Sequence, residues 1–356
     1  MSDSALQQVL GPERPEGMTP RERFRAVVRF EPVDRLPFWE PLGFAPDTLA
    51  HWVANGFPPD TSPEVFFDLE RVELAPIHLG ALPEVEPGML PVTTHDQFER
   101  VQRHYSCYSP ARYPTWWEDD KRAWVQRRYP LGLAAIGPLG WLREWCGGEA
   151  CRVLSEQPGL ARALMTFGVE FCICTLERAG REVEADFALV KDRWGLAEGL
   201  AVDEGVVASL APLYERLAEG LRGFGIETVV LCSDGDVTPL ARRLLDAGVN
   251  GIMPCSARDG VDVMALAKAH PRDLILVGGL DARVLARDRR DADREARLKI
   301  PTAMKRGGWL PCFDSRIGPE AKFDNYRAYW EAALEIAAGE WPPEADGSGR
   351  GAEGQE

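Results

Sequence analysis

The chain has 356 residues, of which 45% are hydrophobic and 27% are charged, and its formal net charge is -15. This length and composition suit one large α/β domain or two ordinary ones. The negative charge argues against a nucleic-acid or anionic-membrane partner, because both of these bind a basic face. An acidic surface by itself keeps a protein soluble and indicates no function.

The start of the sequence and its cysteines indicate a cellular compartment. Residues 1–6 lack a basic region followed by an apolar core, and no run reaches the roughly 18 apolar residues of a membrane-spanning helix. We therefore expect a cytoplasmic protein whose eight cysteines are reduced thiols. Cys172 and Cys174 fall on different faces of a predicted helix, so we interpret them as structural rather than as metal ligands.

The first third of the chain contains strands and helices in an irregular order. Residues 1–18 are polar, with Pro and Gly, and are expected to be flexible. A capping box with Pro at the first helical position predicts a helix over residues 19–28. Strands are expected at residues 35–40 and 71–78. Residues 84–128 interrupt the alternation, and we interpret them as an excursion with a small antiparallel element and a lid.

From Pro130 onward, strands and helices alternate regularly. Apolar runs that end in a turn or a polar group predict strands at residues 130–137, 186–192, 227–232, 249–254, 274–277 and 308–311. The longest helix is expected at residues 158–181, where apolar residues recur at helical spacing. The tail, residues 342–356, is rich in Pro, Gly and Glu and is expected to be disordered.

The fold class follows from this alternation. About eight strand–helix units predict an α/β TIM barrel, formed by a single domain over residues 19–341. A doubly wound open sheet is the alternative. No G-x-G-x-x-G or Walker loop follows any predicted strand, which argues against a nucleotide-binding sheet.

In a TIM barrel the reactive groups lie at the C-terminal ends of the strands. Cys232, Cys255 and Cys312 follow three different predicted strands, and Asp234 lies two residues after the first of them. Thiolates and a carboxylate at one mouth are ligands that would hold zinc. The alternative is that these small side chains fill the rim of the barrel, as free cysteines commonly do.

Carboxylates at the strand ends are candidates for acid–base catalysis. Asp192 and Asp281 each close an apolar strand, where partial burial would raise the pKa of the carboxyl group. Asp234 is the third candidate. A carboxylate in such a position also caps the next helix, and both interpretations of Asp281 remain open.

Other residues near the strand ends are candidates for substrate binding. They are Trp39, Glu40, Trp141, Trp194 and Arg316. The tryptophans would line a pocket for a flat or methylated ligand, and the alternative for each is a place in the core. The arginine would hold a substrate carboxylate, or else form a structural ion pair.

Six short motifs, spread between Thr19 and Ala338, are specific when they occur together. They are Arg21-Glu22-Arg23, Glu31 to Pro37, Lys191 to Gly195, Cys232 to Asp236, Val277 to Asp281 and Gly307 to Ile317. On these motifs the chain resembles the uroporphyrinogen decarboxylase superfamily, in particular the divergent branch that includes corrinoid-linked methyltransferases. The resemblance implies a TIM barrel, in agreement with the strand count.

The sequence departs from both characterised branches of this superfamily. Decarboxylases bind the substrate's carboxylates with an arginine-rich segment after the first strand, whereas the matching residues 38–52 contain no arginine. Zinc methyltransferases use a His-x-Cys pair and a later Cys. Here Cys232 and Asp234 occupy the pair, and Ser315 occupies the later position, with Cys312 three residues earlier.

The resemblance implies methyl transfer between a corrinoid or a methylated small molecule and an acceptor. Zinc held by Cys232, Asp234, Cys255 and Cys312 would assist it. The alternatives are a decarboxylase of a tetrapyrrole or another carboxylated substrate, and a non-catalytic barrel that binds a corrinoid or tetrapyrrole. The expected partners are a small-molecule substrate and a corrinoid protein, with a homodimer left open.

Overall fold

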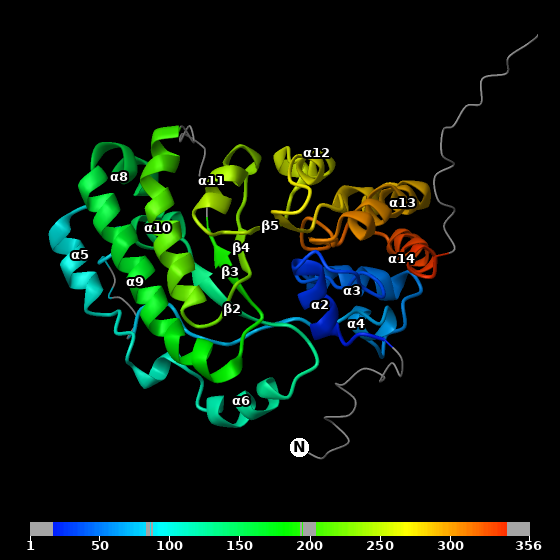
Figure 1. The fold of residues 1–356 in the computed structure, drawn as a ribbon, viewed down its shortest axis with the longest axis horizontal. Coiled ribbons are helices and arrows are strands. Elements are labelled where there is room, and N and C mark those ends of the chain that lie inside the picture. The colour runs from blue at the N-terminus through cyan, green and yellow to red at the C-terminus, as the bar shows by residue number, and fades with distance from the viewer. Residues whose placement is uncertain (1–16, 83–85, 87, 193, 195–203, 340–356) are drawn as a thin grey trace, which may run out of the picture.

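The structure is a computed structural model that describes residues 17–82, 86, 88–192, 194 and 204–339. The predicted disordered tail, 342–356, lies outside these residues, and so does nearly all of the predicted flexible terminus, 1–18. The described residues form a parallel sheet with helices packed around it (Figure 1). The α/β class expected from the sequence is therefore confirmed.

Seven parallel strands pair in the order in which they occur in the chain. They are β1 (Glu73–Leu74), β2 (Leu131–Ile136), β3 (Phe187–Lys191), β4 (Val229–Cys232), β5 (Gly251–Met253), β6 (Ile275–Val277) and β7 (Trp309–Leu310). Because parallel neighbours require a crossover, helices connect them. All the C-terminal strand ends therefore lie at one edge of the curled sheet.

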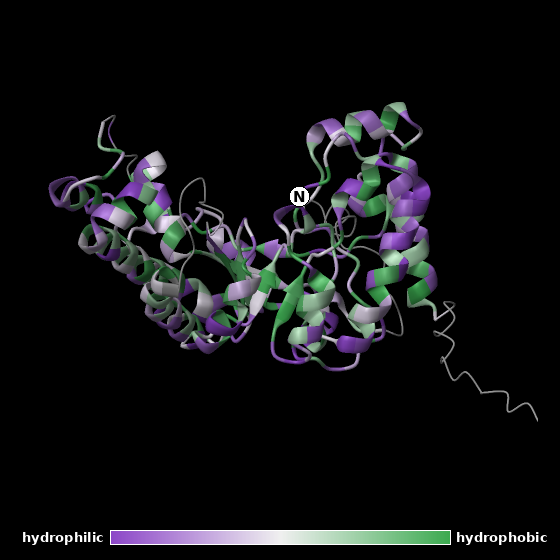
Figure 2. Cartoon of the chain, turned by 90° about the horizontal axis from the view of Figure 1, so that it is seen from above, coloured by the Kyte–Doolittle hydropathy of each residue, from purple (hydrophilic) through white to green (hydrophobic). Residues whose placement is uncertain are grey.

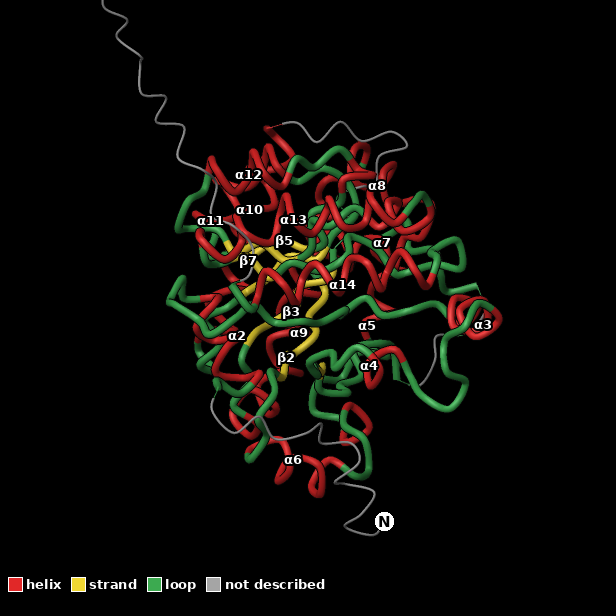
Figure 3. The backbone as a smooth tube through the Cα atoms, turned by 90° about the vertical axis from the view of Figure 1, so that its right-hand side faces the viewer, coloured by secondary structure: helices red, strands yellow, loops and turns green. Residues whose placement is uncertain are grey.

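The helices cover the outside of the sheet. The α-helices are α2 (Pro20–Val28), α3 (Pro46–Ala54), α4 (Pro63–Phe66), α5 (His95–Gln102), α6 (Trp117–Val125), α7 (Pro138–Cys146), α8 (Ala150–Glu156), α9 (Pro158–Val183), α10 (Glu204–Arg222), α11 (Ala241–Asp246), α12 (Val263–Ala269), α13 (Arg289–Arg306) and α14 (Phe323–Ala337). Short 3-10 helices are η1 (Pro110–Arg112), η2 (Gly147–Glu149), η3 (Thr238–Leu240), η4 (Ala257–Asp259) and η5 (Ala282–Ala286). Figures 2 and 3 show the helices arranged around the central strands.

The hydrogen-bonded sheet is open in the described part of the chain, with β1 and β7 at its edges. The strand predicted at residues 35–40 is absent, and that prediction was wrong. The segment still lies between the two edges, because the Glu70 N–H donates to the Phe38 carbonyl and the Phe313 N–H donates to the Glu40 carboxyl group. Pro37 lacks a backbone N–H, which disfavours a ladder here.

Two ion-pair clusters attach α2 to the rest of the fold. The Arg23 guanidinium binds the carboxylates of Asp34 and Glu70, at 2.6 and 2.7 Å. Arg21 binds Asp186, whose side chain is fully buried. Burial acts to raise the pKa of Asp186, but hydrogen bonds from the backbone and from arginines outweigh it and lower the pKa. The arginines near the start of the chain therefore stabilise the fold.

The excursion at residues 84–128 contains α5, η1 and α6, and its described part has no antiparallel strands. The predicted antiparallel element was therefore wrong. The excursion packs along α9, where the Trp117 indole N–H donates to Glu182 at 2.6 Å. A disulfide between Cys107 and Cys174 also joins it to α9. The expectation that all cysteines are reduced was therefore wrong.

Helix α9 is the one described helix that is long and apolar enough to cross a membrane. However, 56% of its most apolar window is buried inside the protein, as expected of a core helix. Cys172 is buried against β2, where its sulfur accepts from the Ile136 N–H, whereas Cys174 bonds to Cys107. Both residues therefore have structural roles, as their different helix faces predicted, but the cross-link through Cys174 was not predicted.

Candidate functional site

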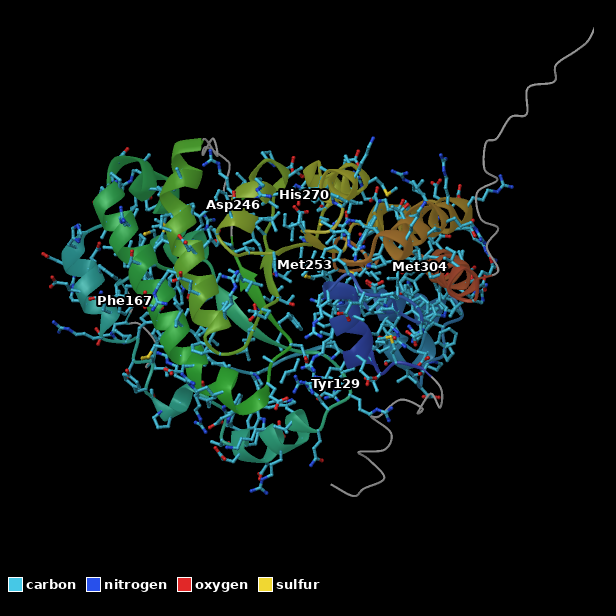
Figure 4. All side chains as sticks on the ribbon, in the orientation of Figure 1. Tyr129, Phe167, Asp246, Met253, His270 and Met304 are labelled. Atoms are coloured by element: carbon cyan, nitrogen blue, oxygen red, sulfur yellow. A yellow bond between two sulfur atoms is a disulfide. The ribbon has the colours of Figure 1, made fainter. Side chains whose placement is uncertain are left out.

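A cavity of about 580 Å³ lies inside the curled sheet. Its wall is formed by Phe24, Trp39, Pro41, Leu42, Val72, Glu73, Leu74, Phe187, Leu189, Lys191, Asp192, Val230, Cys232, Ser233, Asp234, Met253, Pro254, Asp259 and Val277. Figure 4 labels Met253, near the middle of the molecule. The volume and the mostly apolar wall are typical of a small-molecule site.

Strand β3 shows the depth and direction of the cavity. Phe187, Leu189 and Lys191 all line it, because alternate residues of a strand face the same side. Phe187 is buried, Leu189 is half-buried and Lys191 is exposed. These residues span about 13 Å along the strand. The cavity is therefore a shaft that opens at the C-terminal ends of the strands, where the sequence predicted the site.

The rim of the shaft combines a thiol, a cation and a carboxylate. In the register of β3 and β4, Lys191 pairs with Cys232, and both line the shaft. Asp234 follows on the same loop and is exposed. A nearby ammonium group favours the thiolate form of a cysteine. Sequence reasoning missed Lys191, although its two-residue spacing from Leu189 on an alternating strand was a usable signal.

Asp192 lies in the wall of the shaft and is 4% exposed. Its carboxylate accepts hydrogen bonds from the Gly140 N–H near the start of α7 and from the Tyr214 hydroxyl. The close approach requires glycine at position 140, since a Cβ there would lie 2.9 Å from the Lys191 carbonyl oxygen. The catalytic candidate Asp192 is thus held in one orientation by two elements.

Trp194 lies behind this carboxylate rather than in the wall of the shaft. Its indole N–H donates to the Tyr214 hydroxyl at 2.6 Å, and its backbone N–H donates to Ser233 Oγ at 2.8 Å. Burial, followed by the charge of Asp192, raises the pKa of Tyr214 well above its usual value, so the phenol keeps its proton. Trp194 therefore links the ends of β3 and β4.

The remaining predicted substrate-binding residues are spread over different environments. Trp39 lines the shaft. Trp141 is fully buried and packs against Trp145, and Arg316 is exposed and donates to the Phe44 carbonyl at 3.2 Å. The structure therefore places one of these three residues at the shaft.

Glu40 lies beside the shaft but faces the seam between residues 35–40 and β7. The Phe313 N–H donates to its carboxyl group at 3.2 Å, and the Tyr326 hydroxyl donates at 3.5 Å. Burial raises the pKa of Glu40 to about 8, because the charged form is poorly solvated. A mostly protonated carboxyl group therefore closes the seam at neutral pH.

The cysteines predicted as metal ligands are not equivalent. Cys232 lines the shaft, whereas Cys255 and Cys312 are 2% and 0% exposed and are not part of its wall. Burial raises the pKa of Cys255 to about 12. Burial, followed by the charges of Glu40, Cys255, Asp314 and Cys232, raises the pKa of Cys312 well above its usual value. Cys255 has φ +53°, so the strand alternation that brings Met253 to the shaft ends before it.

The predicted zinc ligands do not fit a metal in this arrangement. Across the described residues, no three His, Cys, Asp or Glu side chains form a group that could hold a metal ion. A structural zinc site requires four ligands, and a catalytic site usually requires three. Cys232 and Asp234 would therefore need partners from elsewhere in the chain.

Two further carboxylates organise the loops around the site. Asp281 caps η5 and forms an ion pair with Arg283 at 2.8 Å. Burial acts to raise its pKa, but the hydrogen bonds from Arg283 outweigh it and lower the pKa, so the rise predicted for Asp281 was wrong. Asp314 accepts from the Ala257 and Ala282 N–H groups, so it ties together the loops after β5, β6 and β7. Asp281 is therefore placed as a cap outside the shaft wall.

The fold, but not the sequence, matches known proteins. No protein-family model and no curated protein matches the sequence. A methyltransferase from Methanosarcina mazei aligns in structure with a TM-score of 0.60 and 16% identity, over 90% of this chain and 99% of that chain. The two proteins share a fold.

A second similar structure is a putative vitamin-B12 independent methionine synthase from Listeria monocytogenes. It aligns with a TM-score of 0.36 and 12% identity, over 61% of this chain and 66% of that chain.

Proposed function

We propose that this chain is a methyltransferase-like enzyme of the uroporphyrinogen decarboxylase superfamily, in which the shaft holds the small-molecule substrate. The observation that carries the proposal is the position of Cys232, Lys191 and Asp234 around the open end of a ligand-sized shaft. The shared fold with a protein named as a methyltransferase supports the reaction class. We regard the fold as a TIM-barrel variant in which residues 35–40 replace a regular strand.

Methyl transfer to a thiol acceptor is the chemistry that suits this rim. The acceptor thiolate forms a sulfur–carbon bond to the methyl group, while the bond from the donor to that carbon breaks and its electron pair stays on the donor. Lys191 stabilises the thiolate, and Asp234 receives the thiol proton and passes it to water. Asp192, which accepts a hydrogen bond from the Tyr214 hydroxyl, forms a fixed part of the shaft wall beside the reacting atoms.

The shaft is too small to hold the expected corrinoid. About 580 Å³ accommodates a drug-sized ligand. A corrinoid is considerably larger, so it would approach the rim from outside, presented by a partner protein. The two roles are then separate, with the small molecule in the shaft and the corrinoid at its mouth.

The test is a methyl-transfer assay with methylcobalamin or a methylated ammonium compound as donor and 2-mercaptoethanol as acceptor. The methyl thioether product is quantified by mass spectrometry. We expect turnover above the uncatalysed rate, and a loss of at least about a hundredfold in Asp234→Asn, the lower end of the range for general acid–base catalysis. The exposed Asp119→Asn on α6 serves as the matched control.

Two outcomes would replace this proposal. Release of carbon dioxide from a carboxylated pyrrole, without methyl transfer, would identify a decarboxylase. Tight binding of cobalamin or a porphyrin without any turnover would identify a binding protein. The absence of arginine among residues 38–52 and among the described residues of the shaft wall argues against a polycarboxylate substrate.

A further inference from the structure

We propose that the shaft selects a ligand with an apolar, ring-sized body and a cationic or neutral head, and that it discriminates against anions. The inference rests on the proposed function only for the idea that the head bears the transferable methyl group. The shape and chemistry of the wall specify the ligand class independently of any reaction.

Three aromatic side chains from different elements gather in the wall. Phe24 comes from α2, Trp39 from residues 35–40, and Phe187 from β3. The Phe24 ring lies 6.0 Å from Trp39 and 5.3 Å from Phe187, measured between ring centroids, in edge-on and tilted orientations. Aromatic walls hold flat apolar groups, and they attract cations through the ring faces.

Aliphatic side chains from the next three strands also line the shaft. They are Val230 of β4, Met253 of β5 and Val277 of β6. The polarity changes along its length, because Leu189 lies below Lys191 on β3 and Val230 lies below Cys232 on β4. An amphipathic ligand would therefore enter body first, with its head at Cys232.

The charged groups of the wall favour a cation over an anion. Asp192, Asp234 and Asp259 lie in the described wall, and Lys191 is its only basic residue. Glu73 also lines the shaft, but its carboxylate is paired with Arg71 and accepts from the Tyr129 hydroxyl. An entering anion would meet more carboxylates than ammonium groups, and the low-dielectric wall would strengthen that repulsion.

The decisive experiment is isothermal titration calorimetry with four matched probes at fixed ionic strength. Benzyltrimethylammonium has the ring and the cation, benzyl methyl ether has the ring and a neutral head, phenylacetate has the ring and an anion, and tetramethylammonium has the cation alone. We expect benzyltrimethylammonium to bind at least about tenfold tighter than phenylacetate and than tetramethylammonium. Benzyl methyl ether should bind more weakly than benzyltrimethylammonium and more tightly than phenylacetate.

Variants locate the binding. Leu189→Trp fills the shaft and should weaken benzyltrimethylammonium at least about tenfold, whereas Leu334→Trp on the exposed face of α14 should not. Asp259→Asn should weaken the cation and leave the ether unchanged, with Asp119→Asn as its control. Circular dichroism and thermal melting of each variant verify folding, and Trp39→Leu provides a second, cavity-enlarging test of the same wall.

Equal or tighter binding of phenylacetate would overturn the predicted charge preference. Unchanged binding in folded Leu189→Trp and Trp39→Leu would overturn the location. Selective binding of benzyltrimethylammonium in a protein that transfers no methyl group would uphold this inference and reject the proposed function. If the parent transfers methyl groups and Leu189→Trp transfers them equally well, the proposed function would stand and this inference about the shaft would be rejected.

Discussion

Lys191 and Cys232 are partners in the register of β3 and β4, and both side chains face the shaft. Neighbouring strands of a sheet are about 4.8 Å apart, so the two residues lie side by side at the rim. This pairing distinguishes Cys232 from the buried Cys255 and Cys312. It also leads to the first prediction.

Replacing Lys191 by Met should make Cys232 less reactive, because the neighbouring positive charge that favours its thiolate is lost. We expect alkylation of Cys232 by iodoacetamide at neutral pH to slow by about threefold to tenfold. Peptide mass spectrometry over a time course measures the rate at this residue. Lys268→Met, at an exposed position of α12, is the control, and equal rates in the two variants would contradict the prediction.

The Glu40 carboxyl group should make stability fall as the pH rises. Its pKa is about 8 in the folded protein against an ordinary value of 4.5. Below the ordinary value the group is neutral in both states. Between the two values the unfolded chain loses the proton and the folded chain keeps it, which favours unfolding. The contribution of Glu40 to the free energy of unfolding is therefore greatest in acid and is lost by about pH 8.

Glu40→Gln tests this dependence because the amide is neutral at every pH and its carbonyl still accepts from the Phe313 N–H. We expect the variant to exceed the parent in free energy of unfolding by at least about 1 kcal/mol at pH 8, and by less near pH 5. Urea denaturation over this pH range gives the difference. A gap that does not widen with pH would show that Glu40 does not titrate as proposed.

The disulfide between Cys107 and Cys174 should stabilise the fold by constraining the unfolded chain. The two residues are 67 apart in sequence, a loop for which the chain-entropy relation gives about 4 kcal/mol as an upper range. Cys107→Ser should lower the free energy of unfolding by about 2–4 kcal/mol. Dithiothreitol should do the same to the parent and nothing further to the variant.

A thiol titration provides an independent check on this bond. In denaturant without reductant, the parent should expose six thiols, those of the cysteines outside the disulfide. Cys151→Ser is the control for the loss of a cysteine without loss of the bond. Eight reactive thiols in the parent would mean that the bond does not form.

The hydroxyl group of Tyr214 should support both the fold and the site. Tyr214→Phe removes a donor to Asp192 and the acceptor for the Trp194 indole N–H. Leaving buried polar groups without partners costs about 1–3 kcal/mol, so the melting temperature should fall. Tyr108→Phe, at a position 88% exposed, should melt like the parent. Equal melting of the two variants would rule out this role.

We expect zinc not to bind stoichiometrically, because no three His, Cys, Asp or Glu side chains of the described residues form a group that could hold a metal ion. After incubation with zinc and gel filtration, elemental analysis should find well below one zinc ion per chain. Cys312→Ala should leave the methyl-transfer rate unchanged. One retained zinc per chain, lost in Cys232→Ala, would show that the ligands rearrange around the metal.

Local patterns in the sequence determined much of the architecture. The alternation of apolar runs and helical periodicity from Pro130 onward predicted the parallel sheet, since each signal depends only on neighbouring residues. The capping box at Thr19 predicted the start of α2, and its side-chain oxygen does accept from the Glu22 N–H. Sequence also predicted that the site lies at the C-terminal strand ends, which is where the shaft opens.

Only the tertiary structure decided which strand-end groups meet. Cys232 and Cys255 look alike in sequence, but Cys232 lines the shaft, whereas Cys255, which has a left-handed backbone, is buried and is not part of the wall. Residues 35–40 read as a strand, yet an edge that includes Pro37 forms no ladder. Cys107 and Cys174 meet through packing on α9. The periodicity of the sequence specifies where each strand or helix ends and which of its faces is apolar, because these depend on neighbouring residues. Which side chains meet in space depends on contacts between segments that are distant in the sequence.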